Sequence, residues 1–303
     1  MEPIRTLGEM TGRIIQQKIR KRVAVAMAED PNTIGAIGRA ANAGFAEPLL
    51  IGDEHVIAKR MQEAGLHARG IEIIHEPDEQ KACDIAVKMV KTGQADVLMK
   101  GLVNTDKFLK AVLNRETGLL PKGAVMSYVC AVEIPAYHKL LFISDTAVIP
   151  FPDLQQKAAM LNYAVDMAHR FGIDRPKVAL ISAVEKVSTG IPSTVDYSIL
   201  CSMAARNQIK GCVVDGPLDI FLACDPQAGE IKGVSTTING DADVLLFPSL
   251  EACNAFYKGL MLFAGGELAG LIRGTEKPVV MMSRSESENS KFYCIALSCL
   301  MAD

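Results

Sequence analysis

Short apolar runs of strand length alternate with helix-like segments through the first hundred residues of the chain. After the first run, Asp30 can cap a helix that has Pro31 at its first position and ends near Gly44. Such alternation is typical of a parallel sheet with helices on both faces, so we expect an α/β fold. The predicted strands are 22–28, 48–51, 71–74 and 96–99, and the predicted helices are 30–44, 53–65 and 79–91.

The alternation is interrupted after Leu119, where apolar runs at 124–132 and 139–143 follow each other with no helix between them. We expect them to pair as an antiparallel unit at the edge or the join of a sheet. Residues 146–153 contain two prolines and are interpreted as an interdomain connection. The sequence alone therefore predicts two doubly wound halves divided near residue 150. Beyond the connection, the predicted strands are 177–181, 211–215, 244–247, 268–272 and 279–282, and the predicted helices are 154–171, 193–207, 250–264 and 287–301.

The composition argues against several classes of function. A net charge of −3 over 303 residues gives no large basic field for nucleic acid or an anionic membrane. No apolar run approaches the roughly 20 residues that span a bilayer, and the first 22 residues lack the apolar core of a signal peptide. The eight cysteines form no Cys-x-x-Cys pair, and the five histidines show no metal-ligand spacing. We therefore expect a cytoplasmic protein with no metal site, no nucleic acid partner and no membrane association.

Polar residues in the last fifth of the chain occupy positions suited to a ligand. Asn254, Tyr257 and Lys258 share one face of a predicted helix, at spacings i, i+3 and i+4. Ser283 and Arg284 follow the last predicted strand and precede the last predicted helix. A hydroxyl, a guanidinium and the N–H groups of a helix start suit a phosphate. The alternative for this pair is a capping serine beside a solvated arginine.

Several motifs together resemble the phosphate acetyl/butyryltransferase family, whose members exchange coenzyme A and phosphate on an acyl group. The resemblance covers nearly the whole chain. It is closer to phosphate butyryltransferases than to phosphate acetyltransferases, because the chain contains the sequence motifs Lys-Gly-Leu-Val-Asn-Thr and Asp-Gly-Pro-Leu. The motifs are Met99–Thr105 with Phe108–Asn114, Ile209–Leu218, Phe247-Pro248 with Asn254, Tyr257 and Lys258, and Ser283-Arg284.

The resemblance implies an isocitrate/isopropylmalate dehydrogenase-like fold, with two α/β/α domains flanking a cleft. Residues 1–148 plus 277–303 would form the first domain, and residues 149–276 the second. It also implies the reaction acyl-CoA + phosphate = acyl phosphate + CoA on a short or branched acyl chain, by direct transfer in a ternary complex. Coenzyme A is then a substrate, and no cofactor is expected. Members of this fold pair through the region of the adjacent strands, so we expect a symmetric homodimer with its contact near residues 126–143.

The resemblance also assigns roles to particular residues. Ser283 and Arg284 would bind phosphate, and Glu286 would handle the thiol proton during catalysis. The residues expected to bind substrate are Lys100, Gly101, Asn104, Thr105, Asp215, Asn254, Tyr257 and Lys258. Structural alternatives stand beside these roles. Asn104 or Thr105 can cap the next helix, Asp215 can serve its own turn, and a glutamate in a first helical turn is favoured by the helix dipole.

Three positions depart from the patterns of the family. Butyryltransferases typically carry a second aspartate six residues after the aspartate of Asp-Gly-Pro-Leu, where this chain has Phe221; the nearest acid is Asp219. Phosphate acetyltransferases carry an aspartate seven residues after the motif serine, where this chain has Ser290. Butyryltransferases commonly have Ser-Arg-x-Asp, where the acid position here is Glu286. The proton-handling group is therefore expected to be Glu286, with Glu288 as the second choice.

Two other functions remain open on the sequence. One is a nicotinamide-dependent oxidative decarboxylase on the same fold, which would need a cluster of metal-binding aspartates that the sequence does not convincingly provide. The other is a non-catalytic protein that binds coenzyme A or phosphate, to which the Phe221 departure gives weight. Release of a thiol from acyl-CoA in the presence of phosphate discriminates the expected reaction from both.

Overall fold

The computed structural model describes residues 2–66, 71–282 and 286–302 and divides the chain into two compact units. The first unit comprises Leu7–Met126 and Leu268–Asp303, and the second comprises Met1–Thr6 and Ser127–Glu267. These bounds differ from the predicted domain bounds at 148 and 277, because the adjacent strands after residue 126 group with the second unit. The division into domains stays a prediction; the two units are described separately below.

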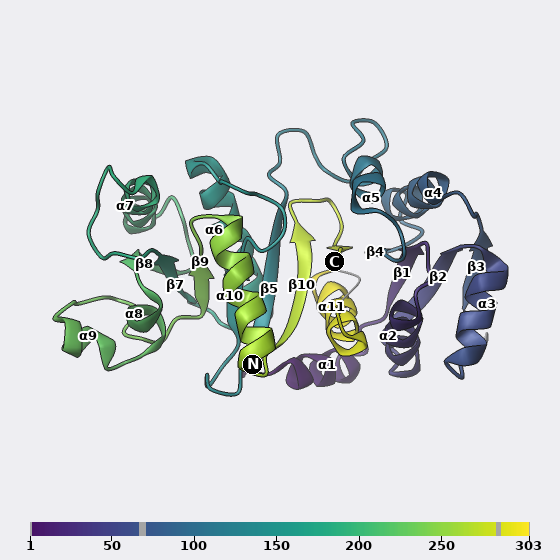
Figure 1. Cartoon of the computed structure of the whole chain (residues 1–303), viewed down its shortest axis with the longest axis horizontal. Helices are drawn as coiled ribbons and strands as arrows, with labels where there is room; N and C mark the ends of the chain where they lie inside the picture. Colours follow the sequence, from purple (N-terminus) through teal and green to yellow (C-terminus); the bar gives the residue numbers. More distant parts are fainter. Residues whose placement is uncertain (1, 67–70, 283–285, 303) are drawn as a thin grey trace. The chain divides into compact units, whose positions relative to one another are not determined.

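The first unit contains a mostly parallel sheet, as the strand–helix alternation predicts (Figure 1). The strand order is β3-β2-β1-β4-β11-β10. All neighbours from β3 to β11 are parallel, and β10 runs antiparallel to β11. The strands are β1 (Lys21–Ala26), β2 (Ala46–Gly52), β3 (Glu72–His75), β4 (Val97–Lys100), β10 (Glu267–Arg273) and β11 (Val279–Val280).

Helices cover both faces of this sheet. In Figure 1, α4 and α5 lie on one face, and α2, α3 and α11 lie on the other. The predicted cap of α2 is confirmed, because Asp30 accepts a hydrogen bond from the Thr33 N–H at 2.8 Å and Pro31 is the first helical residue. The helices are α1 (Leu7–Gln16), α2 (Pro31–Asn42), α3 (Glu54–Glu63), α4 (Glu79–Lys91), α5 (Thr105–Val112) and α11 (Glu288–Met301).

The second unit contains five strands in the order β5-β6-β9-β7-β8. The predicted antiparallel pairing of the two adjacent apolar runs is confirmed, because β5 and β6 pair with Val129 opposite Ser144. The remaining neighbours are parallel, so β6 has a partner on each side. The strands are β5 (Ser127–Glu133), β6 (Leu141–Ser144), β7 (Lys177–Ile181), β8 (Val213–Leu218) and β9 (Val244–Leu246).

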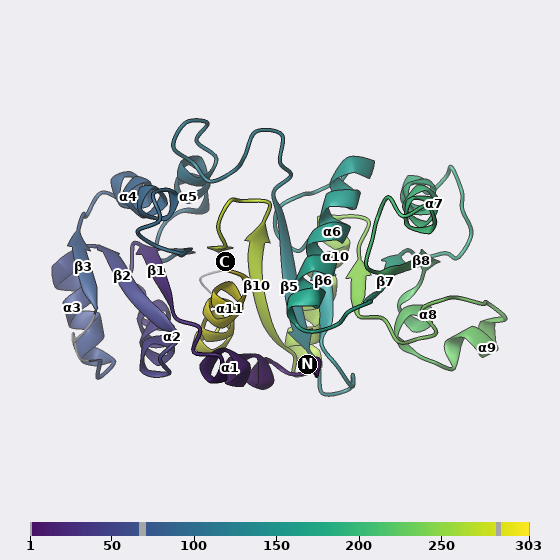
Figure 2. The same cartoon turned by 180° about the vertical axis from the view of Figure 1, so that it is seen from behind.

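Helices also cover both faces of the strands of the second unit. The view in Figure 1 has α10 in front of the strands, and the reverse view in Figure 2 has α6 in front. Residues 146–153, the predicted connection, lie inside this unit and join β6 to α6. Asp153 and Gln156 start α6 with reciprocal hydrogen bonds of 2.8 and 2.9 Å. The helices are α6 (Leu154–Arg170), α7 (Pro192–Ala205), α8 (Ile220–Cys224), α9 (Ala228–Lys232) and α10 (Leu250–Phe263).

The Asp-Gly-Pro-Leu motif corrects one predicted boundary. We expected a strand that ends at Asp215 and then turns, but β8 continues through Leu218. The pairing with β7 shifts register between Ala179 and Ile181, which lets Leu218 pair with Ile181. Gly216 fits this shift because a Cβ there would lie 2.6 Å from the Leu180 Cβ. The motif is therefore a close approach of two strands instead of a turn.

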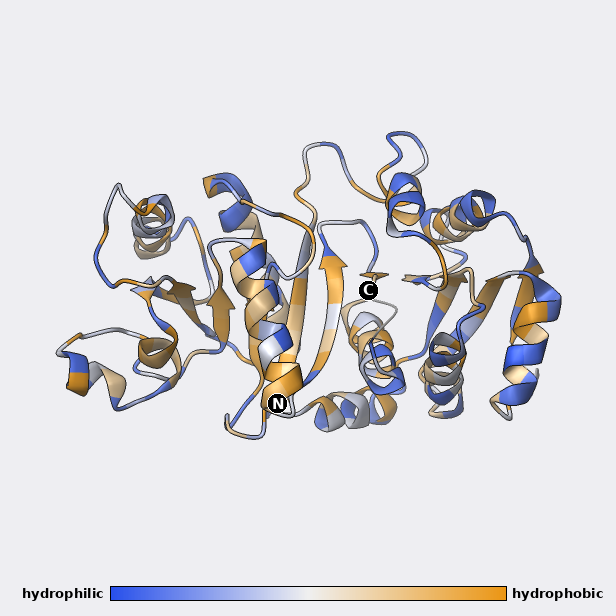
Figure 3. Ribbon diagram, in the orientation of Figure 1, coloured by the Kyte–Doolittle hydropathy of each residue, from blue (hydrophilic) through white to orange (hydrophobic). Residues whose placement is uncertain are grey.

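The strands form the cores of the two units. Figure 3 shows hydrophobic colour along most strands, whereas α3 and α4 carry both hydrophobic and hydrophilic residues. Residues 23–26 of β1 and 129–132 of β5 are buried. Within the described residues, no helix is both long enough and apolar enough to cross a membrane.

Candidate functional site

Lys100 and Gly101 lie at the carboxyl end of β4, as the sequence predicts. Lys100 is only 6% exposed, and its Nζ donates to the Gly101 carbonyl at 3.3 Å. The Gly101 N–H donates to the Ala26 carbonyl at 2.8 Å, and a Cβ on Gly101 would collide with the Met27 carbonyl. Only glycine therefore fits this position, and the loop stays pressed against the end of β1.

Asn104 and Thr105 follow at the start of α5, three and four residues after Gly101. Asn104 occupies the N-cap position, but its side chain makes no capping hydrogen bond to α5. The alternative that the Asn104 side chain caps the next helix is therefore wrong. Thr105 is the first residue of the helix. Lys100, Asn104 and Thr105 therefore lie at and just beyond the carboxyl end of β4.

The start of α11 lies in the same unit. Ser283 and Arg284 fall outside the described residues, so the structure does not place them. Glu286 is described and half-buried, and it precedes Ser287, whose Oγ caps α11 by accepting the Ser290 N–H at 3.0 Å. Ser290, at the position where phosphate acetyltransferases carry an aspartate, is buried inside this first turn.

Glu288 points to α2. Its Oε1 lies 3.3 Å from Nη1 of Arg39, and its carboxylate covers Gly35, where a Cβ would collide with it. The Arg39 guanidinium also lies 4.3 Å from the ring centre of Phe292. Glu288 thus contributes to the packing of α2 against α11. Glu286 therefore stays the first candidate for the proton-handling group.

A buried ion pair fixes α11 to the start of α2. Nζ of Lys291 lies 2.5 Å from Oδ2 of Asp30, and that oxygen also accepts hydrogen bonds from the Thr33 N–H and hydroxyl. Burial alone would raise the pKa of Asp30, but the hydrogen bonds from Lys291 and Thr33 outweigh it and lower the pKa. The segment that enters α11 is therefore anchored five residues after Glu286.

Asp215 lies within β8 in the second unit and holds a distant segment. Its Oδ2 accepts hydrogen bonds from the Thr236 hydroxyl at 2.7 Å and the Thr237 N–H at 2.8 Å, and its Oδ1 accepts the Gly216 N–H. These contacts give Asp215 a structural role beyond its own neighbour. Its expected contact with substrate stays a prediction.

Phe221, at the position where butyryltransferases have an aspartate, is 66% exposed on α8. Asp219 caps that helix by accepting the Leu222 N–H at 2.8 Å, and it pairs with Lys232 at 2.5 Å. Lys232 also pairs with Glu185 at 2.6 Å. The hydrogen bonds to Asp219 outweigh its burial and lower its pKa. Asp219 is therefore occupied by α8 and α9, and it does not take the place of the missing aspartate.

The helix predicted to carry Asn254, Tyr257 and Lys258 is confirmed as α10. Cys253 is its one buried residue, so most of α10 is not enclosed by the described chain. The Asn254 Nδ2 donates to the Thr146 carbonyl at 2.8 Å, Tyr257 is half-buried and Lys258 is exposed. Asn254 therefore holds the loop after β6, while Lys258 extends into solvent.

Sequence reasoning missed a polar group at the carboxyl end of β6. Ser127, Ser144 and Asp145 are buried together there, and the Ser127 hydroxyl donates to Asp145 at 3.0 Å. The signal was a Ser-Asp-Thr run directly after the predicted strand 139–143. We left residues 144 and 145 unassigned and placed Thr146 in the predicted connection. Three polar residues at the end of a buried strand are a pattern that indicates a polar site.

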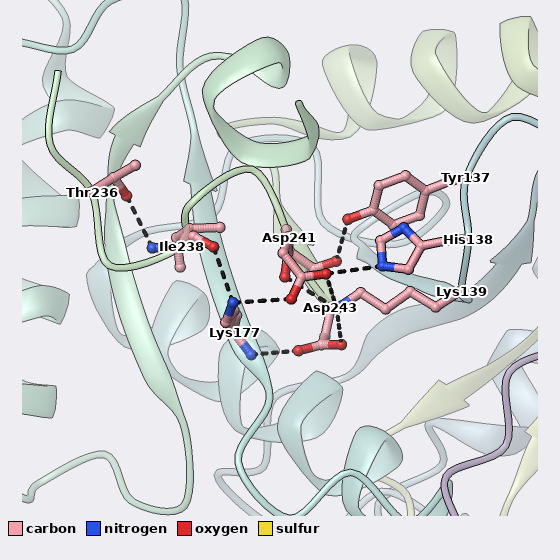
Figure 4. Close-up of polar contacts among 9 residues, drawn as sticks. Tyr137, His138, Lys139, Lys177, Thr236, Ile238, Asp241 and Asp243 are labelled. Atoms are coloured by element: carbon pink, nitrogen blue, oxygen red, sulfur yellow. Dashed lines mark hydrogen bonds and ion pairs between the residues drawn. The ribbon is translucent and has the colours of Figure 1, made fainter. Parts of the chain in front are cut away.

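The opposite ends of the same strands carry a network of ion pairs (Figure 4). Lys139, just before β6, lies 2.8 Å from Asp241 and 2.7 Å from Asp243. Lys177, the first residue of β7, lies 3.0 Å from Asp241, and its N–H donates to Asp243 at 2.8 Å. His138 adds a contact of 3.0 Å to Asp241. The network joins the starts of β6, β7 and β9.

The lysines of this network lower the pKa of Asp241. Burial would raise the pKa of Asp241, but hydrogen bonds from Lys139 and Lys177 outweigh it and lower the pKa to about 2. A cavity of about 190 Å³ opens beside the network and is lined by residues 3–5, 138–140, Ile173, Asp241 and Asp243. Since its lysine and both aspartates are already paired with one another, the network accounts for how the strand starts are held together.

Comparisons with known proteins agree along the chain. Residues 79–299 match the family described as phosphate acetyl/butaryl transferase. The chain is 42% identical over 288 residues to phosphate butyryltransferase of Clostridium acetobutylicum, covering 95% of each chain. It is 39% identical over 282 residues to phosphate acetyltransferase of Thermotoga maritima, covering 93% of this chain and 95% of that one. A branched-chain phosphotransacylase from Enterococcus faecalis V583 has a similar structure, with a TM-score of 0.80 and 30% identity over 93% of this chain and 99% of that one.

Proposed function

The chain belongs to the phosphate acetyl/butyryltransferase family and is a phosphate acyltransferase, and we propose that it acts on acyl-CoA with a short or branched acyl chain. The observation that carries the proposal is the 42% identity to a phosphate butyryltransferase over 95% of both chains. The reaction is acyl-CoA + phosphate = acyl phosphate + CoA. Because the similar proteins bear acetyl, butyryl and branched-chain names, the acyl group is the part that needs measurement.

The proposed substrate-binding residues are those that the family resemblance indicates, and they belong to both units. In the first unit, Ser283 and Arg284 bind phosphate. Lys100 contributes a second positive charge, and Gly101 lets the ligand approach the backbone closely. The Arg284 guanidinium is suited to this task because its planar fork matches two phosphate oxygens. Asn104 and Thr105 of the same unit, and Asp215, Asn254, Tyr257 and Lys258 of the second unit, are the other proposed substrate-binding residues.

The proposed mechanism is direct transfer without an acyl-enzyme. In the direction of acyl-CoA formation, the coenzyme A thiolate attacks the carbonyl carbon of the acyl phosphate, a C–S bond forms, and the C–O bond to phosphate breaks. Phosphate leaves with that electron pair, and its charge is stabilised by Arg284. A thiol has a pKa near 8.5, so most of it is protonated at neutral pH, and Glu286 takes the proton.

A spectrophotometric assay of thiol release tests the proposed reaction. Acyl-CoA from acetyl to isovaleryl is supplied with and without phosphate, and we expect phosphate-dependent release of coenzyme A, fastest with a four- or five-carbon acyl group. Binding of coenzyme A without turnover of any acyl-CoA would favour the non-catalytic alternative. Reduction of NAD with a hydroxy acid, followed at 340 nm, would favour the oxidative decarboxylase.

The proposal also covers assembly, location and the finer fold class. We infer a homodimer in the cytoplasm, of the isocitrate/isopropylmalate dehydrogenase-like type. The predicted contact near residues 126–143 stays a proposal; within this range Val129 and its neighbours on β5 are buried within the single chain, whereas residues 135, 136 and 138 are exposed. Leu262 and Phe263 at the end of α10 are 75% and 86% exposed, and exposed apolar residues of this size favour a contact there.

A further inference from the structure

Asp145 directly follows the last residue of β6 and is 1% exposed. Its Oδ1 accepts hydrogen bonds from the N–H groups of Ala147 and Val148, both at 2.8 Å. Its Oδ2 accepts the hydroxyl of Ser127 at 3.0 Å and the N–H of Tyr128 at 3.1 Å. One carboxylate therefore folds the loop after β6 and ties that loop to the start of β5.

A buried carboxylate is costly unless hydrogen bonds replace the water that it has lost. Burial raises the pKa of Asp145, and the four donors act against that shift because they favour the ionised form. These donors are one hydroxyl and three backbone amides, all neutral groups. Loss of this acceptor would leave several buried donors unsatisfied, so the local fold of the loop depends on the carboxylate.

The loop folded by Asp145 in turn holds α10. Thr146 lies next to Asp145, and its carbonyl accepts the Nδ2 of Asn254 at 2.8 Å. The same loop contacts the start of α10 through the Leu250 N–H, which donates to the Pro150 carbonyl at 3.0 Å. Because Asn254, Tyr257 and Lys258 share one helix face, a change in the position of Thr146 would be passed to all three.

We propose that Asp145 is a positioning residue for the acyl-CoA part of the active site. Its carboxylate fixes the Thr146 carbonyl, the carbonyl fixes the side chain of Asn254, and Asn254 orients the face of α10 that carries Tyr257 and Lys258. Asp145 touches neither substrate in this arrangement. The inference rests on the proposed function, since it takes Asn254 to belong to the substrate site.

A double-mutant cycle tests the chain of contacts. The variants are Asp145→Asn, Asn254→Ala and the double variant, with KM measured for butyryl-CoA and for phosphate, and the dissociation constant for butyryl-CoA measured by calorimetry. Asparagine keeps the shape of Asp145 but turns an NH₂ group toward two of its donors. We expect each single variant to raise the KM for butyryl-CoA about tenfold, as loss of one buried hydrogen bond does, with the KM for phosphate within twofold of wild type.

Non-additivity is the decisive result. If Asp145 acts through Asn254, the double variant should differ from Asn254→Ala by less than threefold instead of by a further factor of about ten. An unfolded protein would lose both substrates together, so the difference between the two KM values separates positioning from general stability. Asp153→Asn is the matched control, because it removes a charge from the same loop but retains a good helix cap and should leave both KM values unchanged.

Each other outcome has a definite meaning. Additive effects, or equal rises in both KM values, would overturn the positioning role while leaving the proposed reaction intact. Wild-type constants for Asn254→Ala would overturn both the substrate role of Asn254 and the inference. If Asp145→Asn fails to fold, Ser127→Ala replaces it in the cycle, since that change removes one donor to Asp145, at 3.0 Å, together with the contact of the same hydroxyl with Ser144. A wild-type protein without turnover would refute the proposed reaction, and the calorimetric constants alone would then decide the positioning role.

Discussion

The ammonium group of Lys291 in α11 lies 2.5 Å from the Asp30 carboxylate that caps α2, with both side chains largely buried. The two residues are 261 positions apart in the sequence, and their contact joins α11 to the start of α2. It lies at the carboxyl end of β1, in the unit that also carries Lys100 and Glu286.

Lys291→Met should therefore destabilise the protein markedly. The substitution keeps the length of the side chain but leaves Asp30 buried without its cation, which typically costs about 3 kcal/mol. Urea unfolding followed by circular dichroism measures the loss. Lys91→Met is the control, because the Lys91–Glu276 pair is exposed and should be worth no more than about 0.5 kcal/mol. Equal losses for the two variants would show that the Asp30 contact has no special weight.

Arg284→Ala should raise the KM for phosphate at least tenfold and change the KM for acyl-CoA much less. Arg284→Lys should recover little, because a single ammonium cannot copy the bidentate fork. Initial rates at varied phosphate and fixed acyl-CoA give the two constants. Arg20→Ala, which removes an exposed pair with Glu47, is a control that should leave both constants unchanged. Equal rises in the two KM values would argue against a phosphate contact.

Glu286→Gln should lower kcat about tenfold or more and leave coenzyme A binding nearly intact, because the amide cannot take the thiol proton. The rate of the variant and of wild type from pH 6 to 9 is the measurement, and the variant should be slower throughout this range. Glu288→Gln is the matched control, since Glu288 packs against Arg39 and should affect stability more than rate. A wild-type profile for Glu286→Gln would remove this residue from the mechanism.

Asp241→Asn should make the second unit less stable at neutral pH, and the difference from wild type should shrink in acid. The pKa of Asp241 is about 2 in the folded protein and its ordinary value is 3.8, so the stabilisation is complete above the ordinary value. It is lost as the pH falls from about 4 to about 2. Because more than a third of this side chain is exposed, the expected contribution is only about 1 kcal/mol.

Urea unfolding at several pH values between 2 and 7 measures this contribution, with Asp174→Asn, an exposed change in the same unit, as the control. A difference between wild type and Asp241→Asn that does not vary with pH would contradict the role of Lys139 and Lys177 in holding the carboxylate ionised.

Phe263→Glu should convert a homodimer into a monomer without unfolding it, because the residue is exposed in the single chain. Val129→Asp should instead prevent folding, since Val129 is buried in β5. Light scattering at micromolar concentration reports the mass against 32.6 kDa for one chain. A stable interface of this kind buries on the order of 2,000 Å². A wild-type mass near that of one chain would refute the dimer.

Most of the fold could be predicted because the alternation of apolar strands with helices is a local signal. The cap at Asp30, the antiparallel pair β5–β6 and the helix that carries Asn254 all follow from short-range patterns. The continuation of β8 through Leu218 could not be predicted, because it depends on a register shift in the partner strand β7. Sequence spacing contains no information about which residues of a neighbouring strand lie opposite.

The candidate site was only partly predictable for the same reason. Lys100 and Gly101 are found at a strand end as expected, because that position follows from the strand itself. Asp145 was missed, because its importance comes from donors on β5 that are 17 and 18 residues away in the sequence. Glu288 was given a possible catalytic role, although its contact with Arg39 spans 249 residues. Side chains that act through long-range contacts leave little trace in a single sequence.

The chain passes between its two units at Thr6–Leu7, Met126–Ser127 and Glu267–Leu268. Apart from its first six residues, the second unit is therefore a single cassette, residues 127–267, inserted into the first. A chimera that exchanges this cassette with a relative would leave Ile4 behind, although Ile4 is buried in the second unit and its N–H donates to the Phe171 carbonyl at 2.8 Å. Transplanting the second unit intact requires residues 1–6 to move with the cassette as a separate piece.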